Sequence, residues 1–442
     1  MDFRWKDRWE KPITYNLQPI TYNLIVSLPP SLPAALLRSL ESLPGFDAES
    51  FLATHQASEQ VSSIRFNPSK SGRNINSLPL RSPVPWCKEG WYLLERPVYT
   101  LDPLIHAGHY YVQEASSMFL RHALEHALGE ESGLRVLDLC AAPGGKSTLL
   151  ASMPQFKLLV CNEIIRTRVP VLIENMVKWG TPHSWVTQND PREVGRLEGF
   201  FDVMVVDAPC SGSGLFRREP ELITEWSERN VQLCAERQQR ILADALPALA
   251  KDGLLVYSTC SYSREEDEMI LDWLMDHDEF ESIAIPVDPS WGVVPVTSAR
   301  GAHGLRFYPD KVRGEGLFMA CLRKLSGIVH APRRSTPSAT VPARDREVAE
   351  PWLKNGGEDL TMIRKEDELF AIPHGLGPDL VVLREAMLLR KTGIRIGSLA
   401  HGEFLPDHEL AVSTIGADDL PALDLDLDQA RDYLRKRSIG PF

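Results

Sequence analysis

The feature that most constrains the fold of this chain is a series of short apolar runs between about residues 134 and 324, separated by segments of helical length. Buried strands that alternate with helices are typical of a doubly wound parallel sheet. Val231, Ile241, Ala245 and Leu249 recur at helical spacing, and Gly253 closes the turn after them. We therefore predict an α/β domain with a Rossmann-like sheet. Its strand candidates are residues 135–139, 157–161, 184–187, 202–206 and 254–258, with late strands at 305–308 and 317–322.

The flanking segments differ in composition from this central region. Residues 31–91 alternate short helical patterns, such as 34–40, with Pro- and Ser-rich turns, which suggests a small accessory domain. A pentapeptide, ITYNL, occurs twice before it, at 13–17 and 20–24, and is too short to define a repeat architecture. Residues 326–350 have linker composition, whereas β-like runs at 380–383 and 394–396 indicate a mostly-β module. The expected division is 1–105, 106–325, 326–350 and 351–442.

Sequence composition indicates the compartment in which this protein is expected. The apolar runs are far shorter than the roughly 20 residues that a membrane helix needs, so we expect no contact with a membrane. The charged start, MDFRWKDR, lacks the apolar stretch of a signal peptide. The seven cysteines are an odd number and contain no C-x-x-C pair, which argues against a disulfide framework or a zinc ribbon. We expect a cytoplasmic protein with reduced thiols and no metal.

The net charge of −12 is unfavourable for a protein that binds nucleic acid, because phosphate contacts require Lys and Arg. Local charge matters more at a binding site. Arg384, Arg390, Lys391 and Arg395 cluster near the C-terminus, and an acidic stretch at 418–428 follows. This layout is compatible with RNA binding.

A nucleotide-like ligand is predicted at the end of the first strand candidate. The run DLCAAPGGK at 138–146 leads from that strand through a Gly-rich turn into a helix, where backbone N–H groups can approach a ligand closely. Glu163 follows the next strand, where such folds hold ribose hydroxyls. Gln188, Asn189 and Asp190 end the third strand and could address an adenine edge.

A phosphate-binding P-loop is the main rival interpretation of this run. Gly145-Lys146-Ser147 matches the end of that motif, but the motif requires glycine where Cys140 stands. Cys140 and Pro143 make a backbone nest around a triphosphate improbable. ATP hydrolysis is thus a minor alternative.

Two cysteines follow the fourth and fifth strand candidates, in DAPCSG at 207–212 and STCS at 258–261. A free cysteine is usually a small core residue, but strand ends beside Pro, Gly and Ser are poor core positions. A thiolate that adds to cytosine C6 turns C5 into a nucleophile for an electrophilic methyl group. Asp207 is placed to assist at N3 and the exocyclic amine, and Lys146 to favour a thiolate. Either cysteine could be the nucleophile on this argument alone.

These motifs together resemble the Sun/nucleolar-protein family of RNA 5-methylcytosine methyltransferases, and the flanking modules resemble its ribosomal small-subunit methyltransferase F branch. Further matching blocks are YVQEASSM at 111–118 and RFYP at 306–309 with GLF at 316–318. The resemblance covers roughly residues 108–324. At 317–318 the family more often has two aromatic residues.

The resemblance implies S-adenosylmethionine as cofactor and RNA as substrate, most often ribosomal RNA, with tRNA still possible. Cys260 resembles the nucleophile and Cys210 the second cysteine, which assists product release. Lys146 and Asp207 would also face the target base, and the C-terminal module resembles a PUA-like RNA-binding domain. The implied cofactor contacts are Cys140, Ala141, Ala142, Pro143, Gly144, Gly145, Lys146, Glu163, Asp190 and Asp207.

Three other interpretations remain open. HALEH at 122–126 fits the H-x-x-E-H pattern of a zinc protease, but no third ligand is evident nearby. A catalytically silent RNA-binding scaffold would keep the fold and lose the cysteines. In DNA cytosine methylation the nucleophile would lie in a Pro-Cys block such as Pro209-Cys210. The intact Cys210 and Cys260 argue against a silent scaffold, and DNA methylation differs from the main prediction in which of the two cysteines is essential.

Overall fold

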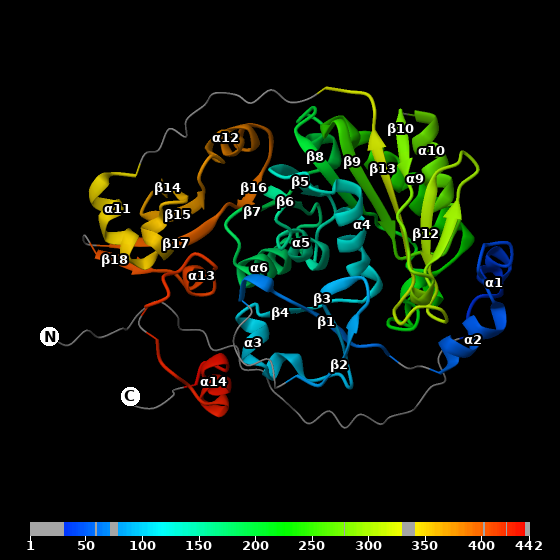
Figure 1. Ribbon diagram of the computed structural model, residues 1–442, viewed down its shortest axis with the longest axis horizontal. Helices are drawn as coiled ribbons and strands as arrows, with labels where there is room; N and C mark the ends of the chain where they lie inside the picture. Colours follow the sequence, from blue (N-terminus) through cyan, green and yellow to red (C-terminus); the bar gives the residue numbers. More distant parts are fainter. Residues whose placement is uncertain are drawn as a thin grey trace.

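The computed structural model describes residues 31–57, 60–70, 78–277, 279–328, 341–400, 403–420 and 422–437. The ITYNL duplication, the charged start of the chain and residues 329–340 of the expected linker lie outside these residues. At the centre is a ten-stranded sheet of order β11-β12-β13-β9-β8-β5-β6-β7-β16, with β10 paired to β13 (Figure 1). Its five parallel strands are β5 (Leu134–Asp138), β6 (Phe156–Asn162), β7 (Ser184–Thr187), β8 (Phe201–Asp207) and β9 (Leu249–Thr259).

Antiparallel strands flank this parallel core. On the β9 side they are β10 (Phe280–Ile283), β11 (Val294–Thr297), β12 (His303–Phe307) and β13 (Leu317–Lys324). On the β7 side a single short strand, β16 (Leu389–Lys391), comes from the C-terminal part of the chain. The α/β prediction is confirmed, and all seven strand candidates of the central region are strands with ends shifted by up to five residues.

Helices cover both faces of the sheet because successive apolar side chains along each strand point alternately to its two faces and form a core on each. Val136, Val203 and Val205 face one core, and Leu137, Met204 and Val206 face the other. The first core is covered by α4 (Phe119–Leu128), α5 (Gly145–Leu150) and α6 (Val169–Trp179). The second is covered by α7 (Pro191–Val194), α9 (Glu228–Ala245), α10 (Glu268–His277) and α12 (Gly377–Ala386). The helix predicted from Val231 onward is α9, but Leu249 belongs to β9, because α9 ends at Ala245.

The N-terminal part begins with two helices, α1 (Ala34–Leu40) and α2 (Ala48–Gln56), that pack on the central domain through a core shared with Tyr262 and Tyr308. A four-stranded antiparallel sheet follows, in the order β2-β3-β1-β4. Its last strand lies just beyond the boundary expected at residue 105, because it pairs with β1. The strands are β1 (Ser63–Phe66), β2 (Leu80–Val84), β3 (Cys87–Leu93) and β4 (Tyr110–Val112), with the short helix α3 (Pro103–His106) before β4.

The C-terminal part is rich in β-structure, as expected, and packs closely on the central domain. Its antiparallel sheet has the order β14-β15-β17-β18. Leu380 and Leu383 of α12 join the second core, and Arg135 pairs with buried Asp379 at 2.6 Å. The remaining elements are β14 (Leu360–Lys365), β15 (Glu368–Pro373), β17 (Ile394–Ala400), β18 (Glu403–Pro406), α11 (Ala343–Ala349), α13 (His408–Ala411) and α14 (Leu427–Leu434), with the four-residue helix α8 (Leu222–Glu225) in the central domain.

One predicted strand in this part is wrong. Residues 380–383 lie in α12 rather than in a strand. Pro378 opens the helix and Asp379 follows in its first turn, both of which suit a helix N-terminus. Four apolar residues are too few to distinguish a strand from a helix. In the described part of the chain, no helix is long and apolar enough to cross a membrane.

Candidate functional site

The carboxyl ends of the parallel strands form the edge at which the sequence motifs meet. After β5 the chain turns through residues 140–144 and enters α5 at Gly145. Gly144 has φ of +115°, a backbone conformation that side chains other than glycine rarely adopt. The turn lines a pocket of about 220 Å³ together with β4 residues Tyr111 and Val112, Asp207 and Arg218. The pocket therefore lies where doubly wound folds bind nucleotides.

Two buried carboxylate oxygens at this edge have no hydrogen-bond donor. They are Oδ1 of Asp138, at the end of β5, and Oε2 of Glu163, just after β6; the latter oxygen has only an ion pair with Arg168 at 3.5 Å among the described residues. Burial raises the pKa of Asp138 to about 7, although Ser147 Oγ donates to its other oxygen at 2.6 Å. Buried acceptors without donors are uncommon in proteins. They fit a ligand that brings hydroxyl or amine donors, as S-adenosylmethionine does with its ribose and amino groups.

At the end of the third parallel strand, β7, two of the three predicted side chains are hydrogen-bonded to the C-terminal part of the chain. Gln188 Oε1 accepts hydrogen bonds from Arg390, and Asn189 Oδ1 accepts one from the Leu388 backbone N–H. Asp190 is exposed and caps α7 by accepting a hydrogen bond from the Arg192 N–H at 3.0 Å. Among the described residues, Asp190 is therefore the one of these three side chains with no hydrogen bond to the C-terminal part of the chain.

Lys146 and Asp207 form an ion pair at the floor of the pocket. Lys146 Nζ lies 2.7 Å from Asp207 Oδ2, and Ser258 Oγ donates to the other carboxylate oxygen at 2.9 Å. Burial alone would lower the pKa of Lys146, but Asp207 and Asp138 raise it overall. Lys146 therefore keeps its charge and pairs with a carboxylate. In a P-loop, the lysine would instead contact the phosphates of the nucleotide.

Cys210 and Cys260 face each other at the ends of β8 and β9. Their sulfur atoms are 2.9 Å apart, and both side chains are partly buried. The hydrogen bond to Cys260, together with burial, raises the pKa of the Cys210 thiol well above its usual range. The Cys210 thiol therefore keeps its proton, and it can donate a hydrogen bond to the Cys260 sulfur. Cys87, Cys161, Cys234 and Cys321 are buried, in keeping with a core role.

Glu266 holds the two cysteine loops together and escaped the sequence analysis. Its carboxylate accepts hydrogen bonds from the Ser211 backbone N–H and hydroxyl, at 2.7 and 2.5 Å, and from the Ser261 hydroxyl at 2.6 Å. Gln238 donates to it as well, at 3.2 Å, and also to the Pro209 carbonyl. One buried side chain therefore fixes the residues that follow both Cys210 and Cys260.

Replacing Glu266 with Gln should reduce the methyl transfer that the family resemblance implies by about 10- to 100-fold and leave cofactor affinity nearly unchanged. An amide of the same shape has one acceptor oxygen, so at least one donor loses its partner, at about 1–3 kcal/mol. Stopped-flow single-turnover kinetics and calorimetry would measure the two quantities. A Glu265→Gln variant is the matched control, because Glu265 is the neighbouring carboxylate and is only partly buried. Equal losses of rate and of cofactor affinity would contradict a positioning role for Glu266.

The acidic run at 266–268 gives no usable sequence signal, because consecutive charges usually mark a solvated surface. Here Glu266 and Asp267 are both 0% exposed and Glu268 is 4% exposed. Arg306, in the RFYP block, pairs with Asp267 and Glu268 at 3.2 and 2.5 Å. The pocket residues Gln113, Glu114 and Arg218 were also missed, although YVQEASSM had been noted as a matching block.

The two histidines of HALEH lie on α4, and His122 makes contacts of another kind. His122 Nε2 is 2.8 Å from the Pro286 carbonyl oxygen, and Glu125 pairs with Arg121. Within the described ranges, no group of three or more His, Cys, Asp or Glu side chains is arranged to hold a metal ion. This arrangement does not favour the zinc interpretation.

Comparison with known proteins agrees with this architecture. Family models for the 16S rRNA methyltransferase RsmB/F and for the N-terminal domain of 16S rRNA methyltransferase RsmF match residues 125–323 and 32–115. Ribosomal RNA small subunit methyltransferase F of Cronobacter sakazakii is 32% identical over 382 residues, which cover 81% of this chain and 77% of that protein. The protein of the same name from Vibrio vulnificus is 30% identical over 377 residues, with coverages of 81% and 78%.

Solved structures share the fold. A methyltransferase homologue from Pyrococcus horikoshii has a TM-score of 0.52 and 28% identity, and the match covers 66% of this chain and all 100% of the other. NSun6 from Pyrococcus horikoshii, solved with SFG, has a TM-score of 0.54 at 19% identity, with coverages of 67% and 99%. At that identity the likeness concerns the fold alone. On the sequence matches, the chain belongs to the RsmB/F family of 16S rRNA methyltransferases, which are S-adenosylmethionine-dependent RNA methyltransferases.

Proposed function

We propose that this protein methylates C5 of a cytosine in small-subunit ribosomal RNA through a covalent bond between Cys260 and C6. The observation that carries the proposal is the 2.9 Å separation of the Cys210 and Cys260 sulfur atoms at the ends of adjacent strands. A methyltransferase that acts on an oxygen or on an exocyclic nitrogen needs no thiol. Two facing thiols beside a cofactor pocket match the chemistry of C5 methylation.

Cys260 begins the reaction. Its thiolate adds to C6 of the cytosine, and the electron pair of the C5–C6 bond moves toward N3. Lys146 and Asp207, held 2.7 Å apart, hydrogen-bond to the polar edge of the base as charge develops there. C5 then becomes nucleophilic enough to take a methyl group. S-adenosylmethionine supplies that methyl group when it is bound.

Cys210 acts at the end of the reaction. A base removes the C5 proton, the C5–C6 double bond forms again, and the bond from C6 to the Cys260 sulfur breaks. The departing sulfur leaves as a thiolate, and the protonated Cys210 thiol can donate a hydrogen bond to it. The raised pKa of Cys210 supports this role, because the proton remains on Cys210 at neutral pH.

The cofactor would be held by the turn at residues 140–146 and by three acidic side chains. Glu163 offers for a ribose hydroxyl a buried oxygen that accepts no hydrogen bond from the residues described and lies 3.5 Å from Arg168 Nη1, and Asp190 lies at the next strand end. Asp207 would lie between the cofactor and the base.

We further propose that the parts of the chain divide the work. Residues 106–325 carry out catalysis, 1–105 form an accessory domain, and 351–442, together with α11 at the end of the expected linker 326–350, act as a PUA-like RNA-binding module. Relatives at 30–32% identity named for small-subunit ribosomal RNA support that substrate over tRNA.

Mapping 5-methylcytosine by bisulfite sequencing in cells with and without this protein tests the proposal. We expect one cytosine of small-subunit ribosomal RNA to lose its methyl group, and the tRNA positions to keep theirs. Reintroducing the wild-type chain should restore the mark. Loss of marks from tRNA alone would contradict ribosomal RNA as the substrate.

A further inference from the structure

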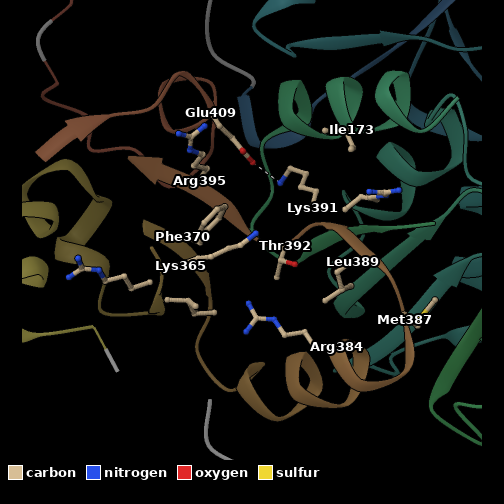
Figure 2. Close-up of a pocket in the computed structure, with 13 residues that line it drawn as sticks. Ile173, Lys365, Phe370, Arg384, Met387, Leu389, Lys391, Thr392, Arg395 and Glu409 are labelled. Atoms are coloured by element: carbon tan, nitrogen blue, oxygen red, sulfur yellow. Dashed lines mark ion pairs between the residues drawn. The ribbon is translucent and has the colours of Figure 1, made fainter. Parts of the chain in front are cut away.

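A cleft of about 600 Å³ lies outside the cofactor pocket, between the central domain and the C-terminal sheet. Its walls come from β14, β15, β17, α12 and β16, with Ile173 of α6 on the opposite side (Figure 2). Six of its lining residues are basic and one is acidic. In a chain with a net charge of −12, this is a marked local reversal of charge.

Three of the six cations are neutralised within the protein. Arg364 pairs with Asp345, Lys391 with Glu409, and Arg395 with Glu368 and Asp407. The Lys391–Glu409 pair is almost fully buried, and its dashed line is visible in Figure 2. These pairs join the elements of the C-terminal part and shape the wall of the cleft.

The other three cations are exposed and carry uncompensated charge. Within the described ranges, Arg390 donates only to the neutral Gln188 side chain. Neither Lys365 nor Arg384 has an ion pair or a hydrogen-bonded side chain among the described residues. In Figure 2, Arg384 extends from α12 toward the cleft and Lys365 reaches in from the opposite wall. Three free positive charges on three different elements therefore surround one cleft.

The floor of the cleft is apolar. Ile363, Met387 and Leu389 line it, and the ring of Phe370, which is partly buried, lies between Arg395 and Lys365 in Figure 2. Positive charge around an apolar or aromatic floor is the combination that binds single-stranded nucleic acid, with phosphates on the cations and a base on the ring. A site for one free phosphate would instead need donors that converge on one point.

We propose that this cleft binds a single-stranded segment of the substrate RNA that flanks the target cytosine, with Lys365, Arg384 and Arg390 on phosphates and Phe370 stacked on a base. The inference rests on the proposed function for RNA as the substrate. It deepens that function by assigning the contact to a surface shared by two domains.

The position of the cleft relative to the active site supports the proposal. β16 pairs with β7, with Leu389 opposite Thr187 at the carboxyl end of that strand. Gln188, which holds Arg390, is separated by one residue from the cofactor candidate Asp190. RNA in the cleft would therefore lie beside the edge of the sheet where methyl transfer takes place.

The experiment is to replace Lys365, Arg384 and Arg390 together with alanine in the full chain. Fluorescence anisotropy with a labelled single-stranded segment of small-subunit ribosomal RNA would measure affinity over a range of salt concentrations. Each phosphate contact on a single strand contributes about 0.7 to the slope of log affinity against log salt, so the slope should fall by about 2 and the affinity by roughly 10- to 50-fold at physiological salt. Phe370→Leu should weaken binding by about tenfold without changing the slope.

The matched control replaces Arg229, Arg237 and Arg240, three exposed cations of α9, with alanine. This variant loses the same charge and should keep the wild-type slope. Unchanged RNA affinity in the cleft variant, or equal loss in both variants, would overturn the proposal. Cofactor affinity by calorimetry should be unchanged in both. If RNA is not methylated at C5 and the cleft variant still loses its affinity, the proposed function fails and the cleft assignment stands.

Discussion

Replacing Cys260 with alanine is expected to abolish methyl transfer, with a loss of at least about 10⁴-fold in rate. Without a sulfur at C6, the C5 carbon of cytosine is too weak a nucleophile to take the methyl group. The thiol lies at the end of β9 and is partly buried, so its removal leaves little empty space. Transfer of a radiolabelled methyl group to RNA would measure the rate, and calorimetry should give wild-type cofactor affinity.

A Cys234→Ala variant is the matched control for this prediction. Cys234 is a buried thiol in α9 that lies outside the pocket. We expect its replacement to cost at most about 1–2 kcal/mol of folding stability and to leave the rate near that of the wild type. A Cys260→Ala protein that methylates normally would show that Cys260 is not the nucleophile. If Cys210→Ala were inactive instead, the assignment would pass to the Pro209-Cys210 block.

Replacing Cys210 with alanine is expected to trap the protein on its RNA. Methylation of C5 would proceed, but the sulfur of Cys260 would leave slowly, because no thiol 2.9 Å away stabilises it. A protein–RNA species that survives denaturing gel electrophoresis should accumulate to near stoichiometric amounts within the first turnover, and steady-state turnover should fall by about 100-fold or more.

Two further variants sharpen this result. The Cys210→Ala/Cys260→Ala double variant should form no covalent species, because the attacking sulfur is absent. Cys210→Ser keeps a hydroxyl donor and should release the product faster than Cys210→Ala does. A long-lived adduct in the double variant, or wild-type turnover in Cys210→Ala, would contradict the role given to Cys210.

The central domain could be predicted well because its signals are local. Each parallel strand is a buried apolar run, and the residues that follow the runs must meet at one edge of the sheet. The pairing of Lys146 with Asp207 follows from this geometry once β5 and β8 are neighbours, and that of Cys210 with Cys260 once β8 and β9 are. The strand order therefore accounts for the proximity of the motif residues at the carboxyl edge of the sheet.

Features that depend on distant partners could not be predicted from the sequence. Glu266 lies in an acidic run that resembles a solvated surface, and only the folded chain brings Ser211 and Gln238 to it. Likewise, β16 has three residues and pairs with a strand about 200 positions earlier in the chain, so no local pattern marks it. The sequence shows the basic residues near the C-terminus. It does not show that Lys391 and Arg395 form ion pairs whereas Arg384 and Arg390 have none among the described residues.

The most direct test of C5 methylation follows the hydrogen atom that the methyl group replaces. Small-subunit ribosomal RNA can be transcribed with tritium at C5 of its cytosines and incubated with the protein and S-adenosylmethionine. We expect one tritium released to water for each methyl group transferred, and no release by the Cys260→Ala variant. Methyl transfer without release of tritium would mean that the methyl group goes to another atom and would contradict the account.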